Sequence, residues 1–115
     1  MSFGGRKDDA AGACLEMMKL VERIAQASPS DPNPRLRLAS LDELLGNVYA
    51  GYDDGTRKIT ATNRVELIEA RRSYQQALDV LGDTIEKFKV STASSQDQMK
   101  TLQEKRDECD GRLGS

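Results

Sequence analysis

The side chains with the greatest potential for chemistry are two cysteines, Cys14 and Cys109, in a chain that contains no histidine. The chain therefore lacks the commonest general base and the commonest metal ligand of proteins. The cysteines do not form a CxxC pair, so the sequence predicts no zinc site. A nucleophilic cysteine would need an adjacent base, which here could only be a lysine or a carboxylate. Both cysteines fall in apolar helical rows, which favours packing as small hydrophobic side chains.

Other chemical motifs are also missing from the sequence. The segment DDGTRK, residues 53–58, has acidic residues and a glycine but lacks the alternating ligands and closing glutamate of a calcium loop. No glycine-rich phosphate loop is present, and no pair of carboxylates stands out as an acid–base couple. We therefore predict no catalytic activity, no metal, no cofactor and no small-molecule substrate.

The charge pattern argues against nucleic acid and membrane partners. Net charge is −2, and acidic and basic residues are spread evenly along the chain. The densest basic group begins near residue 57, but acidic residues interleave with it and Tyr74 is the one aromatic residue near it, so a solvated, salt-bridged face is favoured over a phosphate-binding one. Its members are Arg57, Lys58, Arg64, Arg71 and Arg72.

Composition predicts an all-α protein. The 115 residues are 37% hydrophobic, 4% aromatic and 31% charged, a mixture typical of helices with one apolar stripe and broad polar faces. We find no signal-peptide pattern and no apolar run long enough to cross a membrane. A cytoplasmic or nuclear protein with reduced thiols is the simplest interpretation.

Hydrophobic periodicity predicts a first helix at about residues 7–27, with two adjacent apolar rows. Such a wide face predicts packing against two neighbours. Three prolines in residues 28–34 end this helix, and a second helix is expected at about 35–50. The loop after Gly51 could close as a short hairpin with Tyr52 and Ile59 beside the turn. One row holds Ala10, Ala13, Met17, Leu20 and Ile24, and the other holds Ala11, Cys14, Met18, Val21 and Ala25.

A third helix is expected from Asn63, its candidate N-cap, to about residue 111. One heptad frame runs without interruption from Leu67 to Leu113, which favours a continuous helix through Ser91–Ser95. The chain then forms a three-helix bundle over 1–90 and a coiled-coil extension over 91–115 that belongs to the same structural unit. The alternative is a chain reversal near Ser91–Ser95 that makes a fourth helix of a compact bundle. Glycines in the predicted helices mark either close helix crossings or tolerated surface positions; they are Gly12, Gly46 and Gly82.

These elements predict a non-enzymatic interaction or oligomerisation module. It would be a helical scaffold component of a larger assembly, of the cytoskeletal, kinetochore-like or trafficking kind. The partner would be another protein or a second copy of the chain, which would form a homodimer through the C-terminal half of the long helix. Mutation of two seam residues to Glu would abolish this association without unfolding the bundle. The predicted contact residues are Met99, Leu102, Arg106, Cys109 and Leu113, with the Glu substitutions at Met99 and Leu102. The alternative is a compact chaperone or adaptor that holds a partner helix in an apolar groove on helix one, beside Met17 and Met18.

Overall fold

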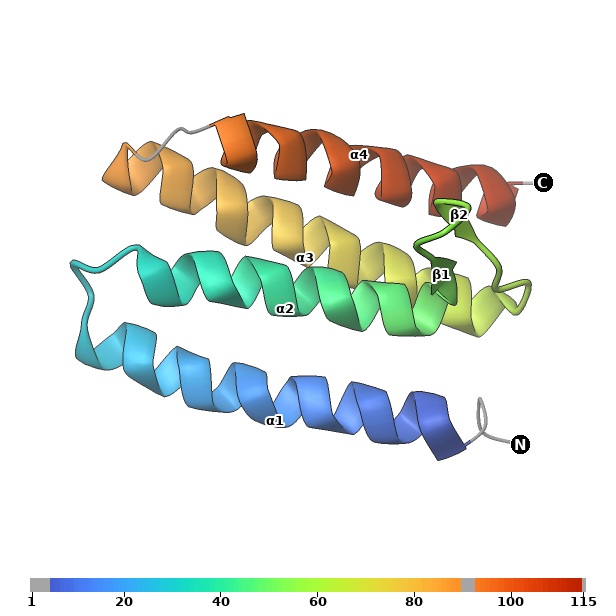
Figure 1. Ribbon diagram of the computed structural model, residues 1–115, viewed down its shortest axis with the longest axis horizontal. Helices are drawn as coiled ribbons and strands as arrows, with labels where there is room; N and C mark the ends of the chain where they lie inside the picture. The colour runs from blue at the N-terminus through green and yellow to red at the C-terminus, as the bar shows by residue number, and fades with distance from the viewer. Residues whose placement is uncertain (1–4, 90–92, 115) are drawn as a thin grey trace.

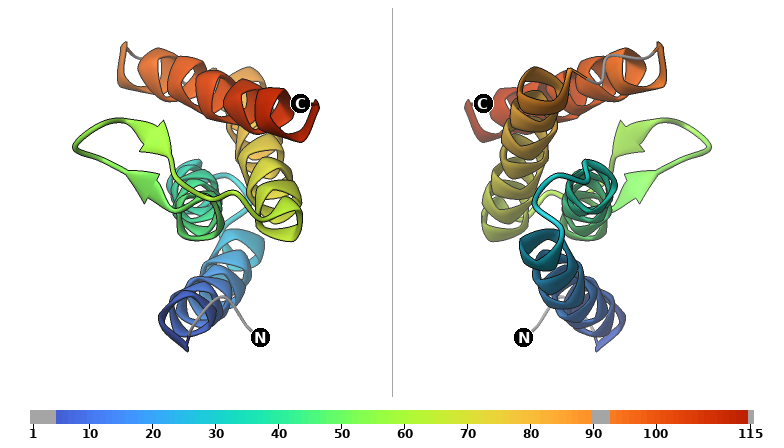
Figure 2. Two further views of the ribbon diagram at one scale, coloured as in Figure 1. Left: turned by 90° about the vertical axis from the view of Figure 1, so that its right-hand side faces the viewer. Right: turned by 90° about the vertical axis from the view of Figure 1, so that its left-hand side faces the viewer.

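The computed structural model describes residues 5–89 and 93–114, which form a bundle of antiparallel helices (Figure 1). This arrangement confirms the all-α prediction. The α2–α3 pair forms the centre, α4 packs on α3, and α1 packs on α2 (Figure 2). The elements in chain order are α1 (Gly5–Ala27), α2 (Asn33–Ala50), β1 (Tyr52–Asp53), β2 (Lys58–Ile59), α3 (Arg64–Phe88) and α4 (Ala93–Gly114).

The prediction of one helix over 63–111 is wrong. Helix α3 ends at Phe88, Lys89 adopts a left-handed conformation with φ of 57°, and α4 lies alongside α3 with the opposite direction (Figure 1). The residues between, 90–92, on which the predicted continuity depended, lie outside the described residues. The alternative of a fourth helix in a compact bundle describes the structure, whose longest dimension is 42 Å.

The reason for this reversal lies in the apolar row of α4. A lone amphipathic helix is marginal in water, so the row must be covered. Folding back covers it within the same chain: Leu102 and Cys109 are fully buried in one cluster with Tyr74 and Leu81 of α3. Two antiparallel helices packed side by side use the same spacing of three and four residues as a coiled coil. The shared heptad frame therefore did not distinguish a rod from a helical hairpin.

The connection between α2 and α3 follows its predicted chemistry. Gly51 ends α2 in a left-handed conformation with φ of 60°, which suits glycine. The predicted hairpin is confirmed, with Tyr52 opposite Ile59 in an antiparallel pair. The Asn63 side chain accepts hydrogen bonds from the backbone of Val65 and Glu66, as expected of an N-cap. The connection is thus fixed at both ends by local backbone requirements.

One of the three glycines permits a close helix crossing. A Cβ atom on Gly46 would lie 2.6 Å from Cε1 of Tyr74. At Gly12 and Gly82, no atom of the described residues outside the adjoining helix backbone comes within 4 Å of such a position. The Tyr74 ring therefore lies directly against the backbone of α2, and its hydroxyl donates to Asn47 Oδ1 at 2.7 Å. Gly46 is the glycine that sets the distance between α2 and α3.

Helix α1 is attached differently from α2, α3 and α4. It belongs to a small separate cluster in which Ala11 and Cys14 pack against Leu45 of α2. Near its start, the Lys7 ammonium pairs with Glu66 of α3 and donates to the carbonyl of Tyr49. Among the described residues, none of the helices has the length and apolar character needed to cross a membrane.

Candidate interaction surface

The contact residues predicted from sequence all lie on α4, and the apolar residues among them face the core of the bundle. Leu102 and Cys109 are 0% exposed, and Met99 and Leu113 pack against the same core. A homodimer through these side chains stays a prediction, and it would require α4 to separate from α3. Because Leu102 is fully buried, the Met99 and Leu102 substitutions to Glu are now expected to disrupt the bundle rather than leave it folded.

Arg106 lies beside this row at the α3–α4 contact. Its Nη1 donates to Gln75 Oε1 of α3 at 2.9 Å, and its Nη2 lies 3.2 Å from Asp107. On the same face, Arg71 of α3 forms an ion pair with Asp110. The charged positions in the heptad frame thus connect α3 to α4 inside one chain.

A buried polar network that the sequence did not reveal fixes α4 to α2. The Lys105 ammonium donates to Glu43 Oε2 at 2.8 Å and to Asn47 Oδ1 at 3.1 Å, and it lies 4.0 Å from the centre of the Tyr52 ring. Lys105 is 7% exposed, so its charge is compensated almost entirely by these groups. Lysine is rarely buried unless it is paired, and sequence spacing gives no sign of partners on another helix.

The two apolar rows of α1 have opposite environments. One row, which we call the inner row, packs on α2 with Val21 and Ala25 buried. It consists of Ala11, Cys14, Met18, Val21 and Ala25. The other row, which we call the outer row, consists of Ala10, Ala13, Met17, Leu20 and Ile24. Its three large side chains are exposed: 51% for Met17, 58% for Leu20 and 54% for Ile24. A helix with two apolar rows is expected to have two neighbours. Within the part of the chain that the structure describes, α1 has a neighbour for its inner row and none for its outer row.

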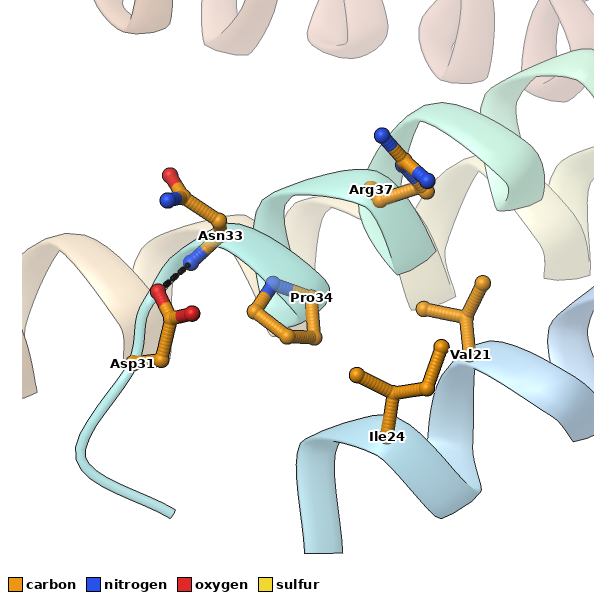
Figure 3. Close-up of a pocket in the computed structure, with 6 residues that line it drawn as sticks. All are labelled: Val21, Ile24, Asp31, Asn33, Pro34 and Arg37. Carbon is orange, nitrogen blue, oxygen red and sulfur yellow. Dashed lines mark hydrogen bonds between the residues drawn. The ribbon is translucent and has the colours of Figure 1, made fainter. Parts of the chain in front are cut away.

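The outer row borders a hollow between α1 and α2 (Figure 3). Its volume is about 160 Å³, and Val21 and Ile24 project toward Pro34 across it. Arg37 of α2 lies at its edge. Leu44, which is 49% exposed, follows Arg37 by two helical turns and therefore lies on the same face of α2. The apolar surface thus continues from α1 onto α2.

Charged residues follow one edge of the outer row. Asp9, Glu16 and Arg23 occur at intervals of seven residues, each directly before an outer-row residue, and all three are exposed. Within the described part of the chain, Glu16 and Arg23 form no ion pair. The opposite edge of the outer row is formed by Cys14 and Val21, which are buried against α2. Charge is therefore available on one side of the row.

Burial suppresses the reactivity of both cysteines. Cys109 is fully buried, and this burial, with the charges of Glu108 and Asp110, raises the pKa of its thiol to about 11. Burial also raises the pKa of Cys14. At neutral pH both thiols are therefore protonated, and the thiolate is the reactive form of cysteine. Their positions agree with the predicted packing role.

A buried carboxyl group lies at the α1–α2 contact. Asp42 is 2% exposed, and its Oδ1 atom has no hydrogen-bond partner among the described residues. Burial, with the nearby charge of Glu22, raises the pKa of Asp42 to about 6. Among residues 5–89 and 93–114 there is no cluster of cysteine and carboxylate side chains that could hold a metal ion. Among the described residues, Asp42 is thus a buried acid near Glu22 that belongs to no metal-binding cluster.

Comparison of the chain with protein-family models, with curated proteins and with solved structures finds no match. The outer row of α1, with the adjoining hollow, is therefore selected as the candidate site on its own geometry.

Proposed function

We propose that this chain is a non-enzymatic protein–protein interaction module that contacts its partner through the outer row of α1. The observation that carries the proposal is the exposure of Met17, Leu20 and Ile24, each more than half exposed, on one face of a regular helix. Contiguous apolar side chains on the surface of a folded domain are typical of contact sites. The spacing of three and four residues suits a partner helix.

We extend this proposal to a helical scaffold role in a larger assembly, of the cytoskeletal, kinetochore-like or trafficking kind. A contact along one helix is small and therefore weak, and it gains strength when several copies are held together. Both cysteines are free, which suits a reducing compartment, so a cytoplasmic or nuclear location belongs to the same proposal.

A second candidate function is a compact adaptor that holds a partner helix between α1 and α2. The hollow lined by Val21, Ile24 and Pro34 favours it, since an apolar side chain of a partner could enter there. Met17 and Met18 also lie on α1, and flexible methionine side chains adapt to different partners. The two candidates differ in whether α2 takes part in the contact.

Site-specific photo-cross-linking in cells that naturally contain the chain would test the proposal. A photoreactive phenylalanine derivative replaces Leu20, and the same residue replaces exposed Gln76 of α3 as the matched control. We expect discrete protein adducts from position 20 that disappear when Ile24 is changed to Glu, and none from position 76. If position 20 gives no protein adduct, either with this chain or with another, the proposal is wrong.

The adaptor candidate is tested with the same derivative at Leu44 on α2. Adducts of the same mass from positions 20 and 44 would support a partner that lies across both helices. Adducts from position 20 alone would exclude α2 from the contact and leave the first candidate.

A further inference from the structure

We infer that the outer row of α1 binds the outer row of a second copy of this chain, with the two α1 helices antiparallel. This inference rests on the proposed function, because it names the partner of the same surface. Ala27 is exposed and extends the outer row by one residue. From residue 10 to residue 27, the row then occupies the two positions of each heptad that contact the partner helix in a coiled coil, which we call the seam positions.

The charges beside the row select the orientation. The first seam residue of each heptad is Ala10, Met17 or Ile24. In an antiparallel pair, the residues directly before these positions, which include Glu16 and Arg23, face the corresponding residues of the second helix. When Met17 lies opposite Leu20 of the second copy, Ala13 lies opposite Ile24 and Ala10 opposite Ala27. Glu16 of each copy then lies opposite Arg23 of the other, offset along the axis by two residues, or about 3 Å.

The twofold symmetry forms this ion pair twice. In a register shifted by one heptad toward the N-terminus, Asp9 would face Arg23 of the second copy, but Glu16 would face Glu16. That register would also overlap four rather than six of the seam positions between Ala10 and Ala27. In a shift of one heptad toward the C-terminus, Arg23 would face Arg23. The charge pattern is therefore complementary to itself in the register that also gives the longest overlap of the apolar rows.

A parallel pair receives no such support. There, Glu16 would face the position five residues later on the second copy, which is Val21, and Asp9 would face Cys14. Both Val21 and Cys14 are buried against α2 and carry no charge. A parallel arrangement would place carboxylates beside apolar side chains, whereas the antiparallel arrangement pairs them with guanidinium groups.

The contact is small, so the association is weak. It consists of one helix pair with alanine at half of its seam positions, and stable dimers bury about 1,200–2,000 Å² in total. We therefore expect a reversible dimer that forms as the concentration rises from about 10 μM to about 1 mM. Sedimentation equilibrium of the purified full chain, under reducing conditions, measures its dissociation constant.

Charge-swap variants test the orientation and the register together. Glu16→Arg and Arg23→Glu each create two like-charge contacts and are expected to weaken the dimer by about 3- to 10-fold. The double variant E16R/R23E restores both ion pairs with the charges exchanged. Its dissociation constant for the dimer should therefore return to within about 2-fold of the wild-type value. Lys19→Glu is the matched control, because it makes the same change in charge as R23E on the same helix but away from the seam.

Leu20→Glu provides the apolar test. Leu20 is 58% exposed, so the variant is expected to keep its helical circular dichroism and to remain monomeric at all concentrations. A wild-type chain that stays monomeric to about 1 mM would overturn the inference. So would a dimer that the double swap does not restore, or that L20E does not abolish.

These results separate the inference from the function on which it rests. A monomeric purified chain that still gives adducts to another protein from position 20 in cells would reject self-association and keep the interaction surface. The absence of any adduct, together with a monomeric chain, would reject both.

Discussion

At the scale of single residues, the environment of Asp42 opposes the ionisation of its carboxyl group. Its carboxyl group is buried close to Glu22, and its Oδ1 atom has no hydrogen-bond partner in residues 5–89 or 93–114. A buried acid with a raised pKa favours its neutral form, so its ionisation opposes folding. The packing of α1 on α2 therefore contains a site that is destabilising at neutral pH.

We predict that Asp42→Asn stabilises the protein at pH 7 by about 1–3 kcal/mol. The pKa of Asp42 is about 6 in the folded chain and about 3.8 as a reference. The unfolded state thus releases this proton first as the pH rises, and the wild type loses stability between about pH 4 and pH 6 relative to the variant. Urea unfolding at a series of pH values measures the difference, which should vanish near pH 3. An equal difference at pH 3 and pH 7 would contradict the assigned cause.

Gly46 is the second residue with a specific structural role. We predict that Gly46→Ala destabilises the protein by about 1–3 kcal/mol, because the added methyl group meets the buried Tyr74 ring at 2.6 Å. Gly82→Ala is the matched control. It has open space around the new Cβ and should gain up to about 1 kcal/mol from helix propensity. Thermal unfolding of both variants decides whether the close crossing or propensity dominates at each position.

At the scale of elements, α1 and α4 have opposite relations to the bundle. The apolar row of α4 is buried against α3, and the Lys105 network attaches the same helix to α2. Helix α1 buries one row and exposes the other. The helix expected to reach out to a partner is thus part of the core, and the helix expected to be core offers the exposed surface.

A pair of equal substitutions measures this contrast. We predict that Leu102→Ala lowers the free energy of unfolding by about 2–5 kcal/mol, since Leu102 is 0% exposed. Leu20→Ala removes the same atoms from a side chain that is 58% exposed, and it should change stability by less than about 0.5 kcal/mol. Denaturant unfolding at low protein concentration provides the comparison. Similar losses for the two variants would mean that α1 is covered in the folded monomer.

At the scale of the whole molecule, the antiparallel helices formed by residues 5–89 and 93–114 pack into a shape of 42 × 27 × 24 Å. A continuous helix over 63–111 would have been about 70 Å long at 1.5 Å per residue. The difference between a rod and a hairpin of helices is therefore large enough to measure in solution.

We predict that X-ray scattering from monomeric Leu20→Glu gives a compact particle with a radius of gyration close to the 14.4 Å of its Cα atoms, increased slightly by hydration. The wild type should show a larger radius at high concentration if α1 pairs with a second copy. A maximum dimension near 70 Å for the L20E monomer would instead indicate an extended helix.

The sequence by itself determined the features that depend on local chemistry. Helical periodicity located α1 and α2, Pro29 and Pro32 separated these two helices, and Asn63 marked the start of α3. Residues 51–61 formed the predicted hairpin. Each of these depends on backbone preferences or on contacts within a few residues, which the order of amino acids encodes directly.

The tertiary structure alone decided which apolar rows are buried. The spacing of Met99, Leu102 and Cys109 is the same in a projecting coiled coil and in a folded-back helix, because period does not specify the partner. The same holds for Met17, Leu20 and Ile24, whose pattern suits core and contact surface equally. Likewise, Lys105 finds Glu43 and Gly46 meets Tyr74 only after α2, α3 and α4 assemble. Where two rows compete for one neighbour, packing geometry determines which row stays exposed.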